Sequence, residues 1–351
     1  MDKDQSKSLQ DRLLQAIGDK TPVAIKGRGS KGFYGDPVMG EALPVADHCG
    51  ILNYEPKELV MTARAGTLLR DIEAVLAENN QMLAFEPPYY GADATLGGTI
   101  ACGFSGPNRA YSGSARDYVL GARIINGKAQ ILRFGGEVMK NVAGYDISRL
   151  MVGARGTLGL LLDISLKTLP RPEAQASYVM DCDQQSALDK MNQLACGKLP
   201  ISASAYGDGR LRVRFSGIKR AIGDLQNSLG MDLMNGDDAA EFWHGLKEHK
   251  TPFFDQNKSP LWRISLPQTA PAMFETSNQI IEWGGAVRWI KTDLEADKIY
   301  DLASQAGGHA CLFYKHKPLN HSVFHPQSTA HQMLARRIKD AFDPDQILNR
   351  S

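Results

Sequence analysis

The first segment suited to chemistry is a short glycine-rich run that carries three cations, Ile25 to Gly32 (IKGRGSKG). The apolar residues before it predict a strand, and its glycines allow consecutive backbone N–H groups to converge on one side of the loop. Ser30 adds a hydroxyl donor, while Lys26, Arg28 and Lys31 add positive charge. A loop of this kind is suited to bind an anion, above all a pyrophosphate.

This loop does not fit the two common nucleotide-binding motifs. The Walker A string G-x-x-x-x-G-K-[ST] is missing from it. Gly27, Gly29 and Gly32 spell G-x-G-x-x-G, but the residues that follow, FYGDPVMGEALP, do not predict the helix that a Rossmann turn must open. Taken alone, the loop can also be interpreted as a plain structural turn.

Two further segments consist largely of small residues. The second segment comprises Glu86–Pro88 and Thr95–Pro107 (TLGGTIACGFSGP), where a flat ligand could lie directly on the main chain. The third comprises Lys140–Asp146 (KNVAGYD) and Gly153–Gly159 (GARGTLG). A bulged loop and a β-turn are the alternative interpretation, but three such segments in less than half the chain favour a ligand site.

Composition limits the classes of protein to which the chain can belong. A length of 351 residues fits two domains at about 150 residues each, and 40 Lys and Arg balance 39 Asp and Glu. This balance gives no reason to expect nucleic acid or an anionic membrane as the main partner. Five scattered cysteines without a C-x-x-C pair argue against a disulfide scaffold, a zinc site or an iron–sulfur site, and favour a reducing compartment.

The N-terminus is charged where a signal peptide needs an apolar core, and no apolar run reaches the roughly 18 residues of a membrane span. We therefore expect a soluble, cytoplasmic protein. Peripheral attachment to the inner membrane through another subunit stays open.

The first part of the chain predicts strands that alternate with glycine turns. Helices are expected over Ser8–Ile17 and over Thr67–Asn79, with Thr67 as the N-cap, and the segment from Pro87 to Gly113 is expected to be irregular. Strand-like runs are PVAIKG, GILNYEP, ELVMTARAG, YVLGARIING, KAQILRFGG and TLGLLLDISLKTLPRP. Pro170 and Pro172 close this part, so we place a domain boundary near Arg171.

The second part of the chain has a different sequence pattern. RLRVRFSG, LWRISLP and GAVRWIK alternate as half-exposed strands do, and Ala187–Leu194 and Thr329–Phe342 predict helices. We therefore expect an α+β protein with a first domain over 1–171 and a smaller α+β domain over 172–351.

The ordered set AIKGRGS, TLGGTIACGFSGP, GSARDYVLG, VMKNVAGYDISRL and GTLGLL resembles the FAD-binding domain of the vanillyl-alcohol oxidase and p-cresol methylhydroxylase (PCMH) superfamily. Within it, the whole chain resembles the FAD-binding subunits of bacterial glycolate oxidases, densely from Thr21 to Arg171 and more loosely through FDPDQILN at the C-terminus. The resemblance implies a PCMH-type FAD-binding domain of two α+β subdomains, followed by a cap domain over the flavin.

The resemblance also implies which residues hold FAD. The pyrophosphate would lie on Gly27, Arg28, Gly29, Ser30 and Lys31. The flavin and ribityl region would meet Pro88, Thr95, Gly97, Gly98, Ser105 and Gly106, with Asn141 and Tyr145 as support, and the adenosine end would meet Gly156, Thr157, Gly159 and Leu161. Arg155 departs from the glutamate that relatives often have at that turn.

Covalent attachment of FAD is not expected. Some members of the superfamily carry a histidine in the first loop that bonds covalently to FAD, but this loop reads G-R-G-S. The nearest histidine, His48, is 18 residues beyond Ser30. We therefore expect non-covalent FAD.

The second part lacks the string H-x-G-D-G-N-x-H that related 2-hydroxy-acid oxidising enzymes carry. Oxidation of a 2-hydroxy acid needs a base for the hydroxyl proton and a cation for the carboxylate. His309 and Arg263 are weak candidates for these roles, and a histidine in a glycine turn is more often structural.

The histidines and tryptophans of the second part could suggest a metal or cofactor site, but their patterns favour structural roles. His309, His316, His321, His325 and His331 suggest a metal, but no carboxylate or thiol at ligand spacing completes a set, and we expect no metal site. The four tryptophans favour core or interface positions. Because the chain has no iron–sulfur motif, electrons from a flavin must leave to another protein or to a diffusible compound.

Three functions follow as hypotheses. The first is an FAD-binding subunit of a glycolate oxidase, in which a larger flavoprotein subunit holds the hydroxy-acid site and an iron–sulfur subunit passes electrons to the respiratory chain. The second is a stand-alone FAD oxidoreductase of another hydroxy acid or alcohol. The third is a structural subunit that has lost flavin, although the intact glycine segments argue against it.

Overall fold

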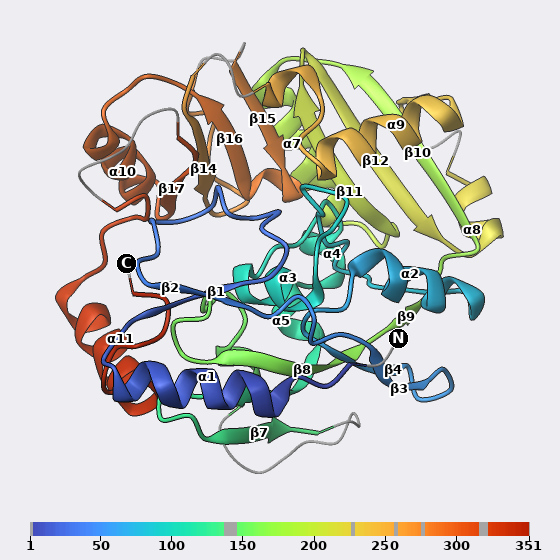
Figure 1. Cartoon of the computed structure of the whole chain (residues 1–351). Coiled ribbons are helices and arrows are strands. Elements are labelled where there is room, and N and C mark those ends of the chain that lie inside the picture. Colours follow the sequence, from blue (N-terminus) through green and yellow to red (C-terminus); the bar gives the residue numbers. More distant parts are fainter. Residues whose placement is uncertain are drawn as a thin grey trace.

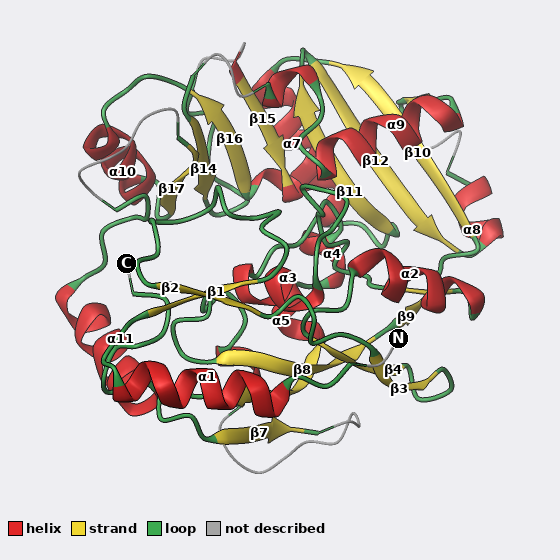
Figure 2. Cartoon of the chain, viewed as in Figure 1, coloured by secondary structure: helices red, strands yellow, loops and turns green. Residues whose placement is uncertain are grey.

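The computed structural model of the chain describes residues 3–136, 146–225, 229–255, 259–274, 278–315 and 322–350. A five-stranded sheet lies in the lower half of Figure 1 and an eight-stranded sheet in the upper half. Both halves contain helices together with an antiparallel sheet (Figure 2), which confirms the predicted α+β class. None of the helices in these ranges is long and apolar enough to span a bilayer.

The first part begins with a helix and a parallel pair of strands. These are α1 (Ser6–Gly18), β1 (Val23–Lys26) and β2 (Glu41–Pro44). Leu9, Leu13 and Ala16 share one face of α1 and are buried, because apolar residues three and four apart form a single stripe on a helix. Leu9 and Leu13 belong to the periodicity that predicted the helix, whereas Leu14, which also belonged to it, is exposed.

An antiparallel sheet with the order β3-β4-β8-β6-β7 completes the first part. Its strands are β3 (Ile51–Glu55), β4 (Val60–Arg64), β6 (Val119–Ile125), β7 (Ile131–Gly135) and β8 (Leu160–Lys167). The short strands β5 (Gln81–Met82) and β9 (Leu169–Pro170) pair with each other. The helices are α2 (Leu69–Glu78), α3 (Leu96–Cys102), α4 (Arg109–Ser112), α5 (Ala115–Tyr118) and α6 (Ile147–Leu150).

Two expectations for this part are wrong. Thr67 is not the N-cap of α2, because its hydroxyl instead accepts from the N–H of Gly50 (2.9 Å) and donates to the Gly50 carbonyl (3.1 Å). The segment predicted to be irregular contains helices α3 and α4. Two glycines weaken the helix signal of α3, but the side chain of Thr95 caps it and burial of Leu96 and Ile100 anchors it.

The second part is one antiparallel sheet with the order β13-β10-β12-β11-β15-β16-β14-β17. Its strands are β10 (Ala174–Asp181), β11 (Ile201–Gly207), β12 (Arg210–Gly217), β13 (Asp232–Leu233), β14 (Leu261–Ser265), β15 (Gln279–Glu282), β16 (Val287–Lys291) and β17 (His309–Tyr314). The helices are α7 (Gln184–Ala195), α8 (Lys219–Gly223), α9 (Gly236–Lys247), α10 (Ala296–Gln305) and α11 (Thr329–Phe342), with 3₁₀ turns η1 (Pro252–Phe254) and η3 (Trp283–Gly285).

The strands of this sheet are more buried than the alternating sequence predicted. In β16, for example, four of five residues are buried. One face of the sheet packs on α7 and α10, with Leu188 and Ile299 in the core. The other face packs on Phe33, Phe104 and neighbouring residues of the first part. Both faces are therefore covered, and polar residues of the inner face lie at the junction of the two parts.

The end of the chain returns to the first part. The N–H of Val23 in β1 donates to the carbonyl of Ile347 (2.8 Å), and the N–H of Gly127 donates to the carbonyl of Phe342 at the end of α11 (2.9 Å). The change from one sheet to the other falls between Pro170 and Ala174, and the division at Arg171 stays a prediction.

Candidate functional site

The first glycine segment is an exposed loop that follows β1. Gly27, Arg28 and Gly29 are exposed, and turns rather than a helix connect the loop to β2. In the described part of the chain, none of the N–H groups of residues 27–31 donates a hydrogen bond. Gly29 has φ +82°, which favours glycine. The loop thus offers a run of free donors to an acceptor outside the protein.

Lys31 supplies a buried positive charge beside these donors. Its residue is only 7% exposed, and its Nζ donates to the Tyr89 carbonyl (3.2 Å) and to Ser30 Oγ (3.4 Å). No carboxylate of the described residues lies within ion-pair distance of this ammonium. Burial lowers the pKa of Lys31 to about 8. A buried ammonium without a counter-ion, next to free N–H groups, fits the pyrophosphate of a dinucleotide.

The structure brings the three predicted segments together. A Cβ on Gly27 would lie 2.8 Å from Thr95 Oγ1, so the first loop lies against the start of α3. The N–H of Arg155 donates to the carbonyl of Ala101 near the end of α3 (2.8 Å). A Cβ on Gly156 would lie 3.3 Å from Ile25 Cδ1, so the third segment lies against β1. The three segments, which are far apart in sequence, therefore lie next to one another in the structure.

Packing alone already requires several of the predicted residues. A Cβ on Gly97, Gly106 or Gly159 would lie 2.7, 2.3 and 2.8 Å from atoms of Ala65, Glu86 and Ile124, respectively. Leu161 is buried in the core of the five-stranded sheet. These positions hold the segments close to one another whether or not a ligand is bound.

The predicted hydroxyl groups also have partners within the protein. Thr95 Oγ1 accepts from the N–H of Gly98 (3.3 Å) as the N-cap of α3. Ser105 Oγ accepts from the N–H of Ala115 (2.9 Å), and Thr157 Oγ1 donates to a carbonyl of its own turn (2.7 Å). Pro88 is buried. Asn141 and Tyr145 lie outside the described residues, which resume at Asp146.

Arg263 and His309 lie on neighbouring strands of the second sheet. Arg263 on β14 pairs with Cys311 of β17, while His309 pairs with Ser265. Both candidates therefore lie on the same face, which is the inner one. The guanidinium of Arg263 lies 5.0 Å from the ring centroid of Trp283. Desolvation and the charge of Arg263 lower the pKa of His309, which is exposed.

Two further ionisable groups near Arg263 were not found from the sequence. Glu282 is buried, accepts from Trp289 Nε1 (2.6 Å), and burial raises its pKa to about 7. Burial lowers the pKa of His249 to about 3, and its ring stacks on Phe254 with centroids 3.9 Å apart. Neither residue belongs to a motif, so no local pattern signals them.

A cluster of aromatic rings joins the first loop to the second sheet. Phe33 and Tyr34 follow the loop directly, and their ring centroids lie 5.4 and 5.5 Å from that of Phe313 on β17. Phe104 and Tyr90 lie in the same cluster, 5.6 Å apart. Phe104 belongs to the second predicted segment, but the sequence analysis gave no role to the other four residues. The one local signal for those four is that Phe33 and Tyr34 adjoin the loop.

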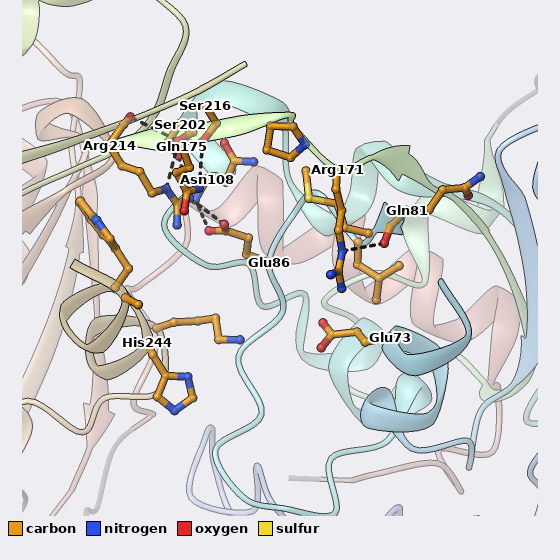
Figure 3. Close-up of a pocket in the computed structure, with 16 residues that line it drawn as sticks. Glu73, Gln81, Glu86, Asn108, Arg171, Gln175, Ser202, Arg214, Ser216 and His244 are labelled. Atoms are coloured by element: carbon orange, nitrogen blue, oxygen red, sulfur yellow. Dashed lines mark hydrogen bonds and ion pairs between the residues drawn. The ribbon is translucent and has the colours of Figure 1, made fainter. Parts of the chain in front are cut away.

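A separate cleft of about 490 Å³ lies between the two parts (Figure 3). Its polar lining includes the cations Arg171, Arg214 and Lys247 and the carboxylates Glu73 and Glu86. Arg214 Nη2 of β12 lies 2.6 Å from Glu86 Oε1, with side-chain exposures of 7% and 22%. This ion pair joins the second sheet to the first part.

The cleft is distinct from the loop 27–31 and the turn 153–159, and of the second segment only Glu86 lines it. None of its lining residues belongs to 27–31 or 153–159, and neither Arg263 nor His309 lines it. Across the described ranges, no group of three or more His, Cys, Asp or Glu side chains is placed to hold a metal ion. His316 and His321 lie outside those ranges.

Comparison with known proteins identifies the family of the chain. Residues 5–135 match the family described as an FAD binding domain. The glycolate oxidase subunit GlcE of Escherichia coli is 46% identical over 347 residues, which is 99% of this chain and 96% of that protein. The glycolate oxidase subunit GlcD of Bacillus subtilis is 31% identical over 172 residues, 48% of this chain and 36% of that one.

The fold is also similar to that of a solved enzyme. An alkyldihydroxyacetonephosphate synthase superposes with a TM-score of 0.64 at 16% identity, over 98% of this chain and 74% of that one. At this identity the likeness shows the fold alone. The match to GlcE, by contrast, runs through both parts at a level that identifies relatives. The chain therefore belongs to the FAD-binding glycolate oxidase subunits, a family of FAD-linked oxidoreductases.

Proposed function

We propose that this chain binds FAD non-covalently within a multi-subunit enzyme that oxidises the CH–OH group of glycolate to glyoxylate. The observation that carries the proposal is the first loop, whose free N–H groups and buried Lys31 ammonium form an anion site in an FAD-binding family. When bound, FAD would supply the two-electron acceptor for this oxidation.

The protein would hold FAD mainly through its backbone. Residues 27–31 would bind the pyrophosphate, and the turn at Gly156 would meet the adenosine end. The rings of Phe33, Tyr34, Tyr90, Phe104 and Phe313 already pack on one another in the core, so the flavin ring would lie beside this cluster and not within it. Residues 88–106 would line the ribityl region between the two.

The surroundings of His48 support non-covalent binding. His48 is fully buried, its Nδ1 accepts from the N–H of Gln5 (3.0 Å), and its Nε2 lies 3.3 Å from Asp163 Oδ1. Both ring nitrogens thus have partners in the core of the first part. This histidine is not free to bond to a flavin.

Partner subunits would complete the enzyme. The names of two similar proteins, GlcE and GlcD, are those of glycolate oxidase subunits. We infer that a larger flavoprotein subunit holds the hydroxy-acid site and that an iron–sulfur subunit carries electrons onward, with peripheral attachment at the inner membrane through these partners. The exposure of His309 supports a catalytic site on another subunit. A base that removes a substrate proton normally lies in a site closed to water, whereas His309 is open to solvent.

A stand-alone oxidoreductase is the second candidate function. It is favoured by Arg263 and His309, which share the inner face of the second sheet. In that case Arg263 would bind a carboxylate and His309 would accept the hydroxyl proton.

The visible absorption spectrum of the purified chain tests both candidates. We expect an FAD spectrum that anaerobic glycolate does not bleach until the partner subunits are added. Bleaching by glycolate alone would favour the stand-alone enzyme. A protein that stays colourless after addition of FAD would contradict both candidates and leave the structural role.

A further inference from the structure

The last described residues of the chain, 347–350, lie directly beside β1. The N–H of Val23 donates to the carbonyl of Ile347 (2.8 Å), and the N–H of Asn349 donates to the carbonyl of Val23 (3.0 Å). Leu348 pairs with Val23 in a parallel bridge. The C-terminal tail therefore pairs alongside the strand that leads into the first glycine loop.

The side chain of Asn349 bonds to two glycine segments at once. Its Oδ1 accepts from the N–H of Ile25 (2.6 Å), two residues before Gly27. Its Nδ2 donates to the carbonyl of Arg155 (2.6 Å), the residue before Gly156. The residue is only 8% exposed, so water does not readily replace either bond.

The chemistry of both partners calls for an amide at this position. One partner is a donor and the other an acceptor, and an asparagine side chain offers both in one plane. Aspartate would turn a carboxylate oxygen toward the Arg155 carbonyl, and leucine would leave both backbone groups unpaired. A Cβ on Gly156 would lie 2.6 Å from Asn349 Nδ2, so the glycine makes room for the amide.

Contacts of α11 fix the tail in this place. Lys339 Nζ donates to the carbonyls of Thr157 (2.6 Å) and Leu348 (2.9 Å) and pairs with Asp343 (2.5 Å). The fully buried Asp343 carboxylate accepts from the N–H groups of Ile347 (3.0 Å) and Leu348 (2.8 Å). The tail is thus bonded both to α11 and to the third glycine segment.

From these contacts we infer that Asn349 is a positioning residue of the cofactor site, which sets the first loop and the Gly156 turn at the spacing that FAD requires. The inference rests on the proposed binding of FAD to these two segments. Asn349 does not itself touch the cofactor in this account. It acts through the backbone of Ile25 and Arg155.

Titration of the FAD-free full-length chain with FAD tests this inference. We expect Asn349→Leu and Asn349→Asp to raise the Kd for FAD by about 10- to 100-fold, because two bonds that hold the segments together are lost. The matched control is Ile299→Ala, a cavity in the core under α10, on the outer face of the second sheet. It should lower the Tm of the FAD-free protein at least as much, yet leave the Kd within about twofold.

Each result decides a different point. An unchanged Kd in Asn349→Leu, with a wild-type chain that binds FAD, would overturn the inference, as would an equal loss of affinity in Ile299→Ala. A wild-type chain that does not bind FAD would instead contradict the proposed function. Where Asn349→Leu does not fold, Asn349→Ser keeps a hydroxyl that is too short to reach both partners, and the same weakening is expected.

Discussion

Replacing Lys31 by methionine should weaken FAD binding while stabilising the FAD-free protein. The two effects have opposite signs because no carboxylate of the described residues pairs with the buried ammonium, so its charge gains a partner only when an anionic ligand binds. A charge-assisted hydrogen bond contributes about 1.5–3 kcal/mol. Loss of one such bond to the pyrophosphate raises the Kd by about 10- to 150-fold near pH 7.

The stability change follows from the pKa of Lys31, about 8 in place of the ordinary 10.5. Below pH 8 the ammonium is charged in the folded and unfolded chains alike, so burying it costs folding about 3 kcal/mol. Between about pH 8 and 10.5 the unfolded chain holds a proton that the folded chain has released. The free energy of unfolding of the FAD-free protein should therefore rise with pH in this window, and Lys31→Met should abolish the rise.

Binding of FAD should show the reverse dependence on pH. A bound pyrophosphate favours the charged ammonium, so above pH 8 binding requires uptake of a proton. The Kd of the wild-type chain should rise by up to about tenfold per pH unit between pH 8 and 9.5. In Lys31→Met it should stay flat over the same range, apart from effects that both proteins share.

Two measurements follow these changes. Flavin fluorescence titrations from pH 7 to 9.5 give the Kd, and chemical denaturation of the FAD-free chain gives the free energy of unfolding. The control is Lys57→Met, which removes an exposed lysine from the turn between β3 and β4. It should change neither quantity. A Kd in Lys31→Met that equals the wild-type value at every pH would refute the placement of the pyrophosphate beside Lys31.

Three further outcomes are expected. Arg214→Ala leaves the Glu86 carboxylate without its partner and should destabilise the chain by about 3 kcal/mol in chemical denaturation, whereas an effect below 1 kcal/mol would show that the ion pair does not hold the two parts together. Acid precipitation of the FAD-loaded chain should release all flavin into the supernatant, and flavin retained in the pellet would contradict non-covalent binding. Arg263→Gln and His309→Ala should leave the rate of flavin reduction by glycolate in the assembled enzyme within about twofold, and a loss of a hundredfold or more would make the second part catalytic.

The sequence predicted the elements whose signal is local. Local patterns predicted α1, α11, the strands of the first sheet and β12, β14 and β16 of the second, and they correctly predicted no helix after the first loop. The other strands of the second sheet, β10, β11, β13, β15 and β17, were not predicted. Helix α3 was missed because Gly97 and Gly98 are poor helix formers. A capping hydroxyl and tertiary burial outweigh that low propensity. Thr67 was misassigned because a loop partner, Gly50, competes for its hydroxyl.

The candidate site was also predicted only in part, because some of its features are local in sequence and others depend on the tertiary fold. Glycine density located the three segments, and resemblance supplied the cofactor. What the sequence could not reveal is which glycines serve packing, since the close approach of Gly106 to the Glu86 carbonyl depends on the tertiary fold. The buried state of Lys31 was equally hidden, because an exposed and a buried lysine read alike in a loop.

The role of the C-terminus shows most clearly what a linear reading misses. The tail follows the second sheet in sequence, so composition and order assign it to that sheet. Its bonds instead reach Ile25 and Arg155, which precede the first loop and the Gly156 turn. The entropic cost of closing a loop rises only slowly with its length, so residues late in a chain can complete a site built from early ones. A site made mainly of backbone depends on such contacts, because its N–H groups keep their spacing only when other residues fix the distance between the segments that carry them.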